Sequence, residues 1–214
     1  LGKRLHEIEN EITGETTAAF EPAIDYVVTK VPRWPNEKFP ETEFELGTAM
    51  KSTGEAMAIG RTFEESLLKA LRSTEYDADV DWASVSDSEL ETTYLERPTP
   101  DRPYAMFEAF DRGYTVDEVV DLTGIEEWYV ERYQNVAEAA EAAADGEFGA
   151  AAEAGFTNQE VAAMAGAEAG AATPMASRAT GAADGGLVED VETSAPDRSF
   201  KQVDTCAGEF AAST

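Results

Sequence analysis

The chain contains very few of the residues on which metal binding and nucleophilic catalysis usually depend. Its 214 residues include one histidine, His6, and one cysteine, Cys206. We therefore exclude a zinc cluster and a Ser-His-Asp triad, because either would have to rely on one histidine in a polar segment. A single cysteine excludes a disulfide within the chain and fits a reducing compartment. We interpret Cys206 as a packed side chain and not as a nucleophile, because no histidine lies near it in the sequence.

Long apolar runs are also missing. No run of about 18 apolar residues occurs, so we expect no transmembrane helix. The opening LGKRLHEIENEITG is amphipathic and polar, unlike a signal peptide. These features predict a cytoplasmic protein with no membrane partner. The chain does not begin with Met, which fits a processed or excised piece.

Positive charge is scarce. Lysine and arginine number 16 against 44 aspartate and glutamate residues, giving a net charge of −28 and an isoelectric point near 4.1. The acids are spread among apolar positions, which favours a surface adapted to molar salt over a disordered acidic tail. A charge of this sign argues against nucleic acid as a partner. Because like charges repel, we expect the fold to loosen below about molar salt.

The stretch AMKSTGEAMAIGRT, residues 49–62, invites comparison with a phosphate-binding P-loop because it combines Lys-Ser with nearby glycines. A P-loop needs glycine directly before the lysine, whereas Met50 precedes Lys51 here. The sequence predicts instead a strand at 56–59 and a turn. Lys51 and Glu55 are expected to pair or to face solvent.

Residues 1–75 are predicted to form an α/β region with too few strands for an independent core. A segment rich in Val, Tyr and Thr predicts a buried strand at 25–31, which Pro32 is expected to end. Further along, Thr62 is expected to cap a helix, with Glu65 three residues later completing a capping box.

The rest of the chain divides by composition. Residues 76–103 are acidic and proline-rich, and we predict a linker with one short helix at 86–94. Residues 104–199 are predicted to form an all-α domain that ends in a low-complexity stretch at 166–199. Residues 200–214 regain apolar character and are expected to lead into a further region.

An internal echo lies within the helical part. GYTVDEVVDLTGI (113–125) is matched by GFTNQEVAAMAGA (155–167). In each copy the Thr and the Glu three residues later predict a capping box, and the last Gly predicts a helix end. The helix after the first copy offers aromatic and aliphatic core candidates: Trp128, Tyr129, Tyr133 and Val136.

A short capped helix that turns into a second helix is also typical of a helix-turn-helix DNA-binding domain. Such a domain needs basic or amide side chains on its second helix. Here that helix opens Glu126-Glu127, and only Arg132, Gln134 and Asn135 could contribute. The pattern therefore favours two helices packed at a corner, with a DNA-binding regulator or a stand-alone assembly domain as alternatives.

The chain resembles the large subunit of carbamoyl-phosphate synthase in five blocks that follow the family's order: FEPAIDYVVTKVPRW, MKSTGEAMAIGRTFEESLLKALRS, AFDRGYTVDEVVDLTGIEEWYVERY, GFTNQEVAAMAG and FKQVDTCAGEFA. The resemblance implies a mixed fold: a partial α/β ATP-grasp C-terminal piece followed by an all-α helical oligomerisation domain. It places residues 1–75 at the end of the first ATP-grasp half and residues 200–214 at the junction to the second.

The resemblance also implies a ligase that makes carbamoyl phosphate from ATP, bicarbonate and glutamine-derived ammonia for pyrimidine and arginine synthesis. The family's residues for ATP and Mg²⁺ (or Mn²⁺) match positions upstream of Leu1. We therefore expect no catalytic, cofactor-binding or metal-binding residue in this piece, and no activity from it alone. Its expected role is assembly and the architecture of an intermediate tunnel. The implied partners are the rest of the large subunit, a glutaminase small subunit and further copies bound through the helical domain.

The resemblance assigns possible roles to four residues. It implies that Ile24 and Met50 line the tunnel, where apolar walls would exclude water from an unstable intermediate. The alternative is that both are ordinary core residues. It also implies that Lys30 and Arg33 face the active site, with surface charges at a strand end as the alternative.

Overall fold

The computed structural model describes residues 2–11, 13–19, 26–34, 45–76 and 80–166. The chain divides into two compact units, residues 1–26 with 198–214 and residues 27–197, and each is considered by itself. The predicted low-complexity and junction segments and Cys206 lie outside the described residues.

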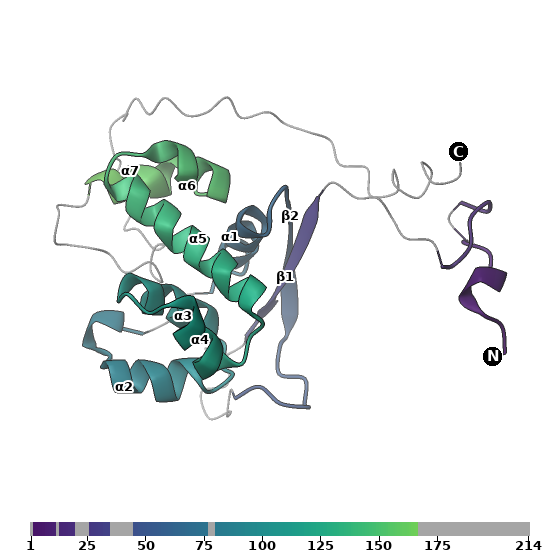
Figure 1. The fold of residues 1–214 in the computed structure, drawn as a ribbon, viewed down its shortest axis with the longest axis horizontal. Coiled ribbons are helices and arrows are strands. Elements are labelled where there is room, and N and C mark those ends of the chain that lie inside the picture. The colour runs from purple at the N-terminus through teal and green to yellow at the C-terminus, as the bar shows by residue number, and fades with distance from the viewer. Residues whose placement is uncertain (1, 12, 20–25, 35–44, 77–79, 167–214) are drawn as a thin grey trace. The chain divides into compact units, whose positions relative to one another are not determined.

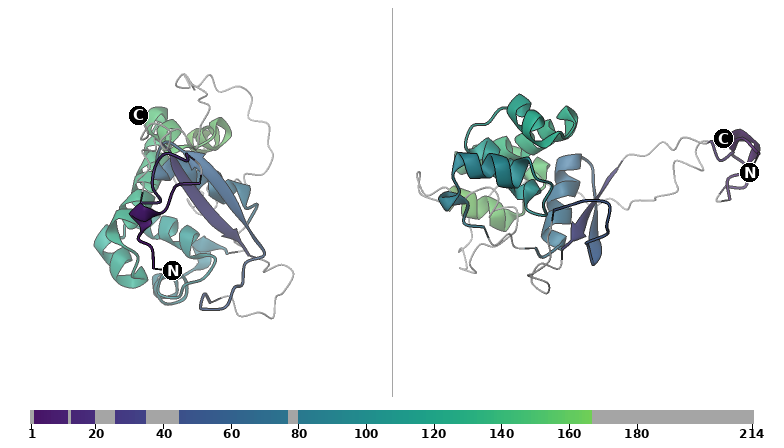
Figure 2. Two further views of the ribbon diagram at one scale, coloured as in Figure 1. Left: turned by 90° about the vertical axis from the view of Figure 1, so that its right-hand side faces the viewer. Right: turned by 90° about the horizontal axis from the view of Figure 1, so that it is seen from below.

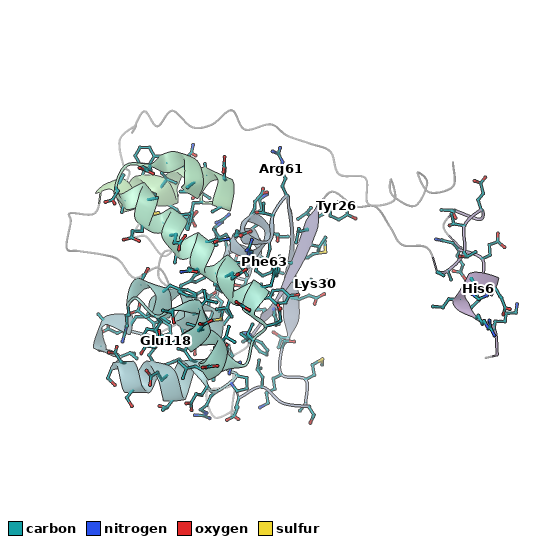
Figure 3. The ribbon with its side chains drawn as sticks, in the orientation of Figure 1. His6, Tyr26, Lys30, Arg61, Phe63 and Glu118 are labelled. Atoms are coloured by element: carbon teal, nitrogen blue, oxygen red, sulfur yellow. The ribbon has the colours of Figure 1, made fainter. Side chains whose placement is uncertain are left out.

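The described part of the first unit is short and has little regular structure. It contains the 3₁₀ helix η1 (Leu5–Glu7) and an isolated antiparallel bridge between Glu9 and Thr17. His6 lies on η1 with an exposed side chain, as expected of a histidine in a polar segment (Figure 3).

In the described residues of the second unit, two antiparallel strands form a sheet. Strand β1 (Val27–Arg33) pairs with β2 (Gly54–Gly60), with Val27 opposite Gly60 and Arg33 opposite Gly54. The prediction that Pro32 ends the first strand is wrong, because the strand continues through it to Arg33. In this two-stranded sheet both strands are edges, where a proline lacking its N–H can be tolerated.

Helix α1 (Phe63–Ser73) covers one face of the sheet (Figure 1). Thr62 caps it as predicted, since its Oγ1 accepts the Glu65 N–H at 3.2 Å. The capping box is not completed: the Glu65 carboxylate accepts the N–H of Arg61 at 2.7 Å. Buried leucines follow on the helix at 67, 68 and 71, as its sequence pattern indicates.

Residues 80–103 pack into the core, which corrects the prediction of a linker across this region. The segment contains η2 (Trp82–Ser84), α2 (Asp87–Glu89) and a π-helical turn, η3 (Leu90–Leu95). Trp82, Leu90 and Leu95 are almost fully buried. The short helix predicted at 86–94 is therefore present, although only residues 87–89 are α-helical and residues 90–95 are wound as a π-helix. The sequence prediction missed these anchoring residues because most of their neighbours are acidic. The predicted domain boundaries stay predictions.

The remaining described helices form a layer on the far side of α1 from the sheet, as the view from below in Figure 2 shows. They are α3 (Arg102–Asp111), α4 (Val116–Thr123), α5 (Glu127–Ala144), α6 (Phe148–Ala154) and α7 (Asn158–Gly166). Their core includes Tyr104, Phe107, Val130 and Phe156, all buried. This bears out the predicted helical domain, while the ATP-grasp origin of the sheet stays an expectation.

The two echo copies form capped helices as predicted. Thr115 and Glu118 make a capping box at the start of α4, and Gly124 ends that helix with a φ of 67°. In the second copy the Glu160 N–H donates to Thr157 Oγ1 at 3.2 Å, and the Thr157 N–H donates to the Glu160 carboxylate. The sequence after Gly166 lies outside the described residues, so its predicted helix end stays a prediction.

Two of the four core candidates on α5 are wrong. Trp128 and Tyr129 each keep 46% of their surface exposed, whereas Val136 is fully buried and Tyr133 packs against the core. Val130 is the buried residue of this first turn of α5, and the two exposed rings instead contact Phe63 at the start of α1.

Candidate functional site

Helix α1 joins the sheet to the helical layer. On the sheet side, Thr29 Oγ1 and Ser66 Oγ share a hydrogen bond of 2.6 Å, and Lys69 Nζ donates to the carbonyl of Ile59 at 3.3 Å. Contacts on its other side reach α5, α6 and α7. We call the contacts between α1 and these three helices the α1 seam; its members are Phe63, Glu64, Glu65, Arg72, Trp128, Tyr129, Arg132, Asn135, Gly155 and Glu160.

A largely buried ion pair closes the seam at the C-terminal end of α1. Arg72 Nη1 lies 3.3 Å from a carboxylate oxygen of Glu160, and Arg72 Nη2 donates to the carbonyl of Gly155 at 3.0 Å. Only 21% of the Arg72 side chain and 9% of the Glu160 side chain are exposed. Salt screens such a pair much less than it screens surface charges.

Backbone contact between α1 and the α6–α7 turn is close enough to require glycine. Gly155 has a φ of +96°, and a Cβ added to it would lie 2.8 Å from Glu65 Cα. A residue with a side chain is strained in that backbone conformation, and a Cβ would not fit at that distance from another backbone atom. The second copy of the echo motif therefore places its first glycine where α1 and the α6–α7 turn meet.

Glu64 anchors the N-terminal end of the seam. It accepts a hydrogen bond from Asn135 Nδ2 at 2.9 Å and lies 3.7 Å from Arg132 Nη1. Phe63 packs edge-on against Trp128 and Tyr129, with ring centroids 5.7 and 5.6 Å apart.

Two of the three side chains considered for DNA contact on this helix belong to the seam. Arg132 and Asn135 both contact Glu64, and the Arg132 guanidinium also lies 5.3 Å from the centre of the Trp128 ring. Their contacts within the protein explain their presence on α5 without a nucleic-acid partner.

Glu65 is held in its charged form inside the seam. Burial would raise the pKa of its carboxyl, but the Arg61 N–H and the Lys69 ammonium outweigh burial and hold the pKa below the ordinary value of 4.5. The negative charge also suits the first turn of α1, where helix backbone N–H groups carry partial positive charge.

The residues singled out by resemblance do not converge. Lys30 pairs with Glu55 at 2.9 Å on the outward face of the sheet, and both side chains are more than half exposed. Arg33 donates to the carbonyl of Thr74 at 2.6 Å, beyond the end of α1. Three residues apart on one strand, Lys30 and Arg33 face opposite sides of the sheet. Ile24 lies outside the described residues.

Met50 and Lys51 precede β2. The Met50 side chain is 90% exposed, so it is not an ordinary core residue within this piece. Lys51 Nζ donates to the carbonyl of Glu45, while Glu55 pairs with Lys30. The pairing of Lys51 with Glu55 that the sequence suggested as one option is therefore wrong.

The sequence offered only partial signals for the seam. Glu160 and Gly155 stood out as a cap and a turn, but nothing local pointed to their contacts with α1. Arg72 lies 88 positions from Glu160 and 83 from Gly155, so the pairing becomes visible only in the fold.

Within the described ranges, no group of three or more His, Cys, Asp or Glu side chains is arranged to hold a metal ion. In that same part of the chain, every helix is too short or too polar to cross a membrane.

Comparison with known proteins assigns the family. Residues 55–179, more than half of the chain, match the family described as carbamoyl-phosphate synthetase large chain, oligomerisation domain. The chain belongs to the carbamoyl-phosphate synthase large-chain family. This confirms the resemblance seen in the sequence, and it does not favour the helix-turn-helix regulator.

Similar large chains extend over the whole sequence. A carbamoyl phosphate synthase large chain from Halobacterium salinarum is 67% identical over 216 residues, which cover all of this chain and 19% of that protein. One from Methanoregula boonei is 41% identical over 218 residues, covering all of this chain and 18% of that protein. A protein from Methanopyrus kandleri named as the N-terminal section of the large chain is 49% identical over 143 residues, covering 64% of this chain and 25% of that protein. The chain thus spans about a fifth of the first two relatives, and the Halobacterium relative is consistent with salt adaptation.

Proposed function

We propose that the protein containing this chain is a ligase that makes carbamoyl phosphate from ATP, bicarbonate and glutamine-derived ammonia, and that it serves pyrimidine and arginine synthesis in the cytoplasm. This proposal is supported by membership of the large-chain family, and by a large chain that is similar to this chain over its whole length. Within it, this piece serves assembly and the architecture around the intermediate tunnel. Its partners are the rest of the large chain, the glutaminase subunit and further copies of itself.

ATP and Mg²⁺ (or Mn²⁺) are proposed to bind elsewhere in the large chain. Some carboxylates of the described residues are used in ion pairs and helix caps, and among those residues no group of three or more is arranged to hold a metal ion. We therefore assign no step of the phosphorylation chemistry to this piece.

The sheet is proposed to be the end of an ATP-grasp domain whose other parts lie outside this chain. Its outward face carries exposed apolar side chains, Val28 and Met57, and Met50, in the segment before β2, is exposed as well. Apolar side chains in these positions suit a surface that another part of the same protein covers. A place for Met50 in the tunnel wall, with Ile24, is proposed on the family resemblance, as is a place for Lys30 and Arg33 near an active site; of the last two, only Lys30 lies on this outward face.

The observation that carries the assembly role is the match of residues 55–179 to the family's oligomerisation domain, and the α1 seam is the way this domain is attached to the sheet. It fixes the helical layer to the sheet through backbone contact at Gly155 and the shielded Arg72–Glu160 pair. A helical domain fixed in this way can hold subunits together while keeping the sheet in a set position.

The test compares the full large chain with this piece in molar KCl, each with the glutaminase subunit. The full chain should form carbamoyl phosphate, whereas the piece should form none. In sedimentation, the piece should self-associate as its concentration rises. Carbamoyl phosphate formed by the piece alone would contradict the assigned division of labour, and a monomer at every concentration would contradict the assembly role.

A further inference from the structure

A cavity of about 270 Å³ lies away from the α1 seam, where the end of β1, the end of α1, α3 and α5 meet. Its lining is mainly aromatic and aliphatic and includes Trp34, Leu46, Tyr76, Tyr104, Met106 and Tyr133. The rings of Tyr76 and Tyr104 are stacked, with centroids 5.9 Å apart and planes 23° from parallel. Stacked tyrosines and prolines form a rigid wall against which another flat ring can pack.

One part of this lining is polar, and its hydrogen bonds are incomplete. Thr99 Oγ1 and Arg102 Nε are buried, and neither has a hydrogen-bond partner within the part of the chain that the structure describes. Arg102 Nη2 donates to the carbonyl of Glu96 at 2.7 Å, so the guanidinium is held in place. A buried donor without an acceptor costs free energy, which an acceptor entering the cavity would recover.

Among the described residues that line this cavity, the charged side chain is a cation, Arg102. Arg102 and Thr99 line the cavity, whereas the neighbouring Asp101 does not, and its carboxylate accepts the Tyr76 hydroxyl at 2.7 Å. Burial lowers the pKa of Arg102, but arginine stays charged in proteins. A phosphate, with three strong acceptor oxygens, would need more donors than one guanidinium and one hydroxyl supply. A carboxylate needs fewer.

We propose that this cavity is a binding site for a small aromatic carboxylate, with its ring against Tyr76 and Tyr104 and its carboxylate accepting hydrogen bonds from Arg102 and Thr99. An apolar pocket with a few convergent polar groups is the usual form of a small-molecule site. Such a ligand would touch the sheet, α1 and the helical layer together, so its binding would stiffen their junction.

The test uses the full large chain in molar KCl with 4-fluorophenylacetate as the probe, followed by broadening of its ¹⁹F resonance. The matched neutral probe is 4-fluorophenylacetamide. The acid should bind at least about tenfold more tightly than the amide, since hydrogen bonds to charged groups exceed neutral ones by that order. Absence of binding by the acid, or equal binding of both probes, would overturn the proposal.

Variants of lining residues test whether the probe binds in this cavity. Arg102→Met keeps an unbranched side chain but removes the charge, and should weaken binding of the acid about tenfold; Arg61→Met, outside the cavity, should not. Leu46 is 37% exposed and lines the cavity, so Leu46→Trp should obstruct it without disturbing the core. Val28→Trp, on the outward face of the sheet, is its control. Unchanged binding in Arg102→Met or Leu46→Trp would show that the probe binds elsewhere and would contradict the proposal.

Discussion

Glu160 performs two tasks with one carboxylate. It caps the first turn of α7 through the Thr157 N–H, and it pairs with Arg72 across the α1 seam. Only the first task was visible in the sequence, because the capping partner lies three residues away and the arginine 88 residues away. Local hydrogen bonds of this kind can be predicted from one sequence, while partners brought together by packing cannot.

We predict that Glu160→Gln destabilises the chain by about 2 kcal/mol, because it leaves the shielded Arg72 without its counter-charge. Urea unfolding in molar KCl measures the effect. The control is Glu55→Gln, which removes the exposed partner of Lys30 and should cost less than about 1 kcal/mol. Equal costs for the two variants would show that burial of the seam pair adds nothing.

Gly155 and Gly146 provide a matched pair, because both have positive φ values, +96° and +93°. An added Cβ at Gly146 meets nothing within 4 Å, whereas at Gly155 it meets the α1 backbone. Gly146→Ala should therefore cost about 1 kcal/mol from backbone strain alone. Gly155→Ala should cost at least about 1 kcal/mol more from overlap with α1. Unfolding midpoints of both variants decide this, and similar losses would argue against close approach at Gly155.

The pH dependence of stability should report the Glu65 carboxylate. Its pKa is lower in the folded chain than the ordinary 4.5, so it stabilises the fold above pH 4.5 and loses that contribution as the pH falls through its folded pKa. The advantage of the wild type over Glu65→Gln should thus be constant near neutral pH and vanish in acid. Urea midpoints across that range test it, with the exposed Glu138→Gln as control. An advantage that persists in acid would contradict the prediction.

At the scale of elements, the sequence predicted helices better than it predicted their exposed and buried faces. The caps at Thr62, Thr115 and Thr157 were correct because each depends on residues three apart. Trp128 and Tyr129 were misjudged because burial depends on how far a helix extends past its neighbours. The segment containing Trp82 was misjudged for a related reason, since its acidic composition hid the apolar residues that anchor it.

Leu90 tests whether the segment at 80–103 belongs to the core. Its side chain is fully buried at the start of η3, so Leu90→Ala should destabilise the second unit by about 3 kcal/mol. The exposed Thr92→Ala is the control and should stay within about 0.5 kcal/mol. Thermal unfolding in molar KCl compares them. A cost at Leu90 as small as that at Thr92 would restore the linker interpretation.

For the whole molecule, a net charge of −28 sets the conditions under which these contacts hold. Self-repulsion acts over longer distances as salt is diluted, while the shielded Arg72–Glu160 pair depends little on salt. We predict that helical circular dichroism falls as KCl is reduced below about molar concentration. Neutral sucrose at matched osmolality is the control and should not replace the salt. A full helical signal in dilute buffer would refute the prediction.

The α1 seam also has a consequence for synthesis on the ribosome. Arg72 is translated 88 residues before Glu160, so at about 5–20 residues per second the sheet and α1 wait roughly 4–18 s for their partner. Through that interval the apolar side of α1 has no α6–α7 turn to meet. During that interval chaperones and proteases can reach this side of α1 in the nascent chain. We expect that access to end when Gly155 and Glu160 have been synthesised and pack against α1.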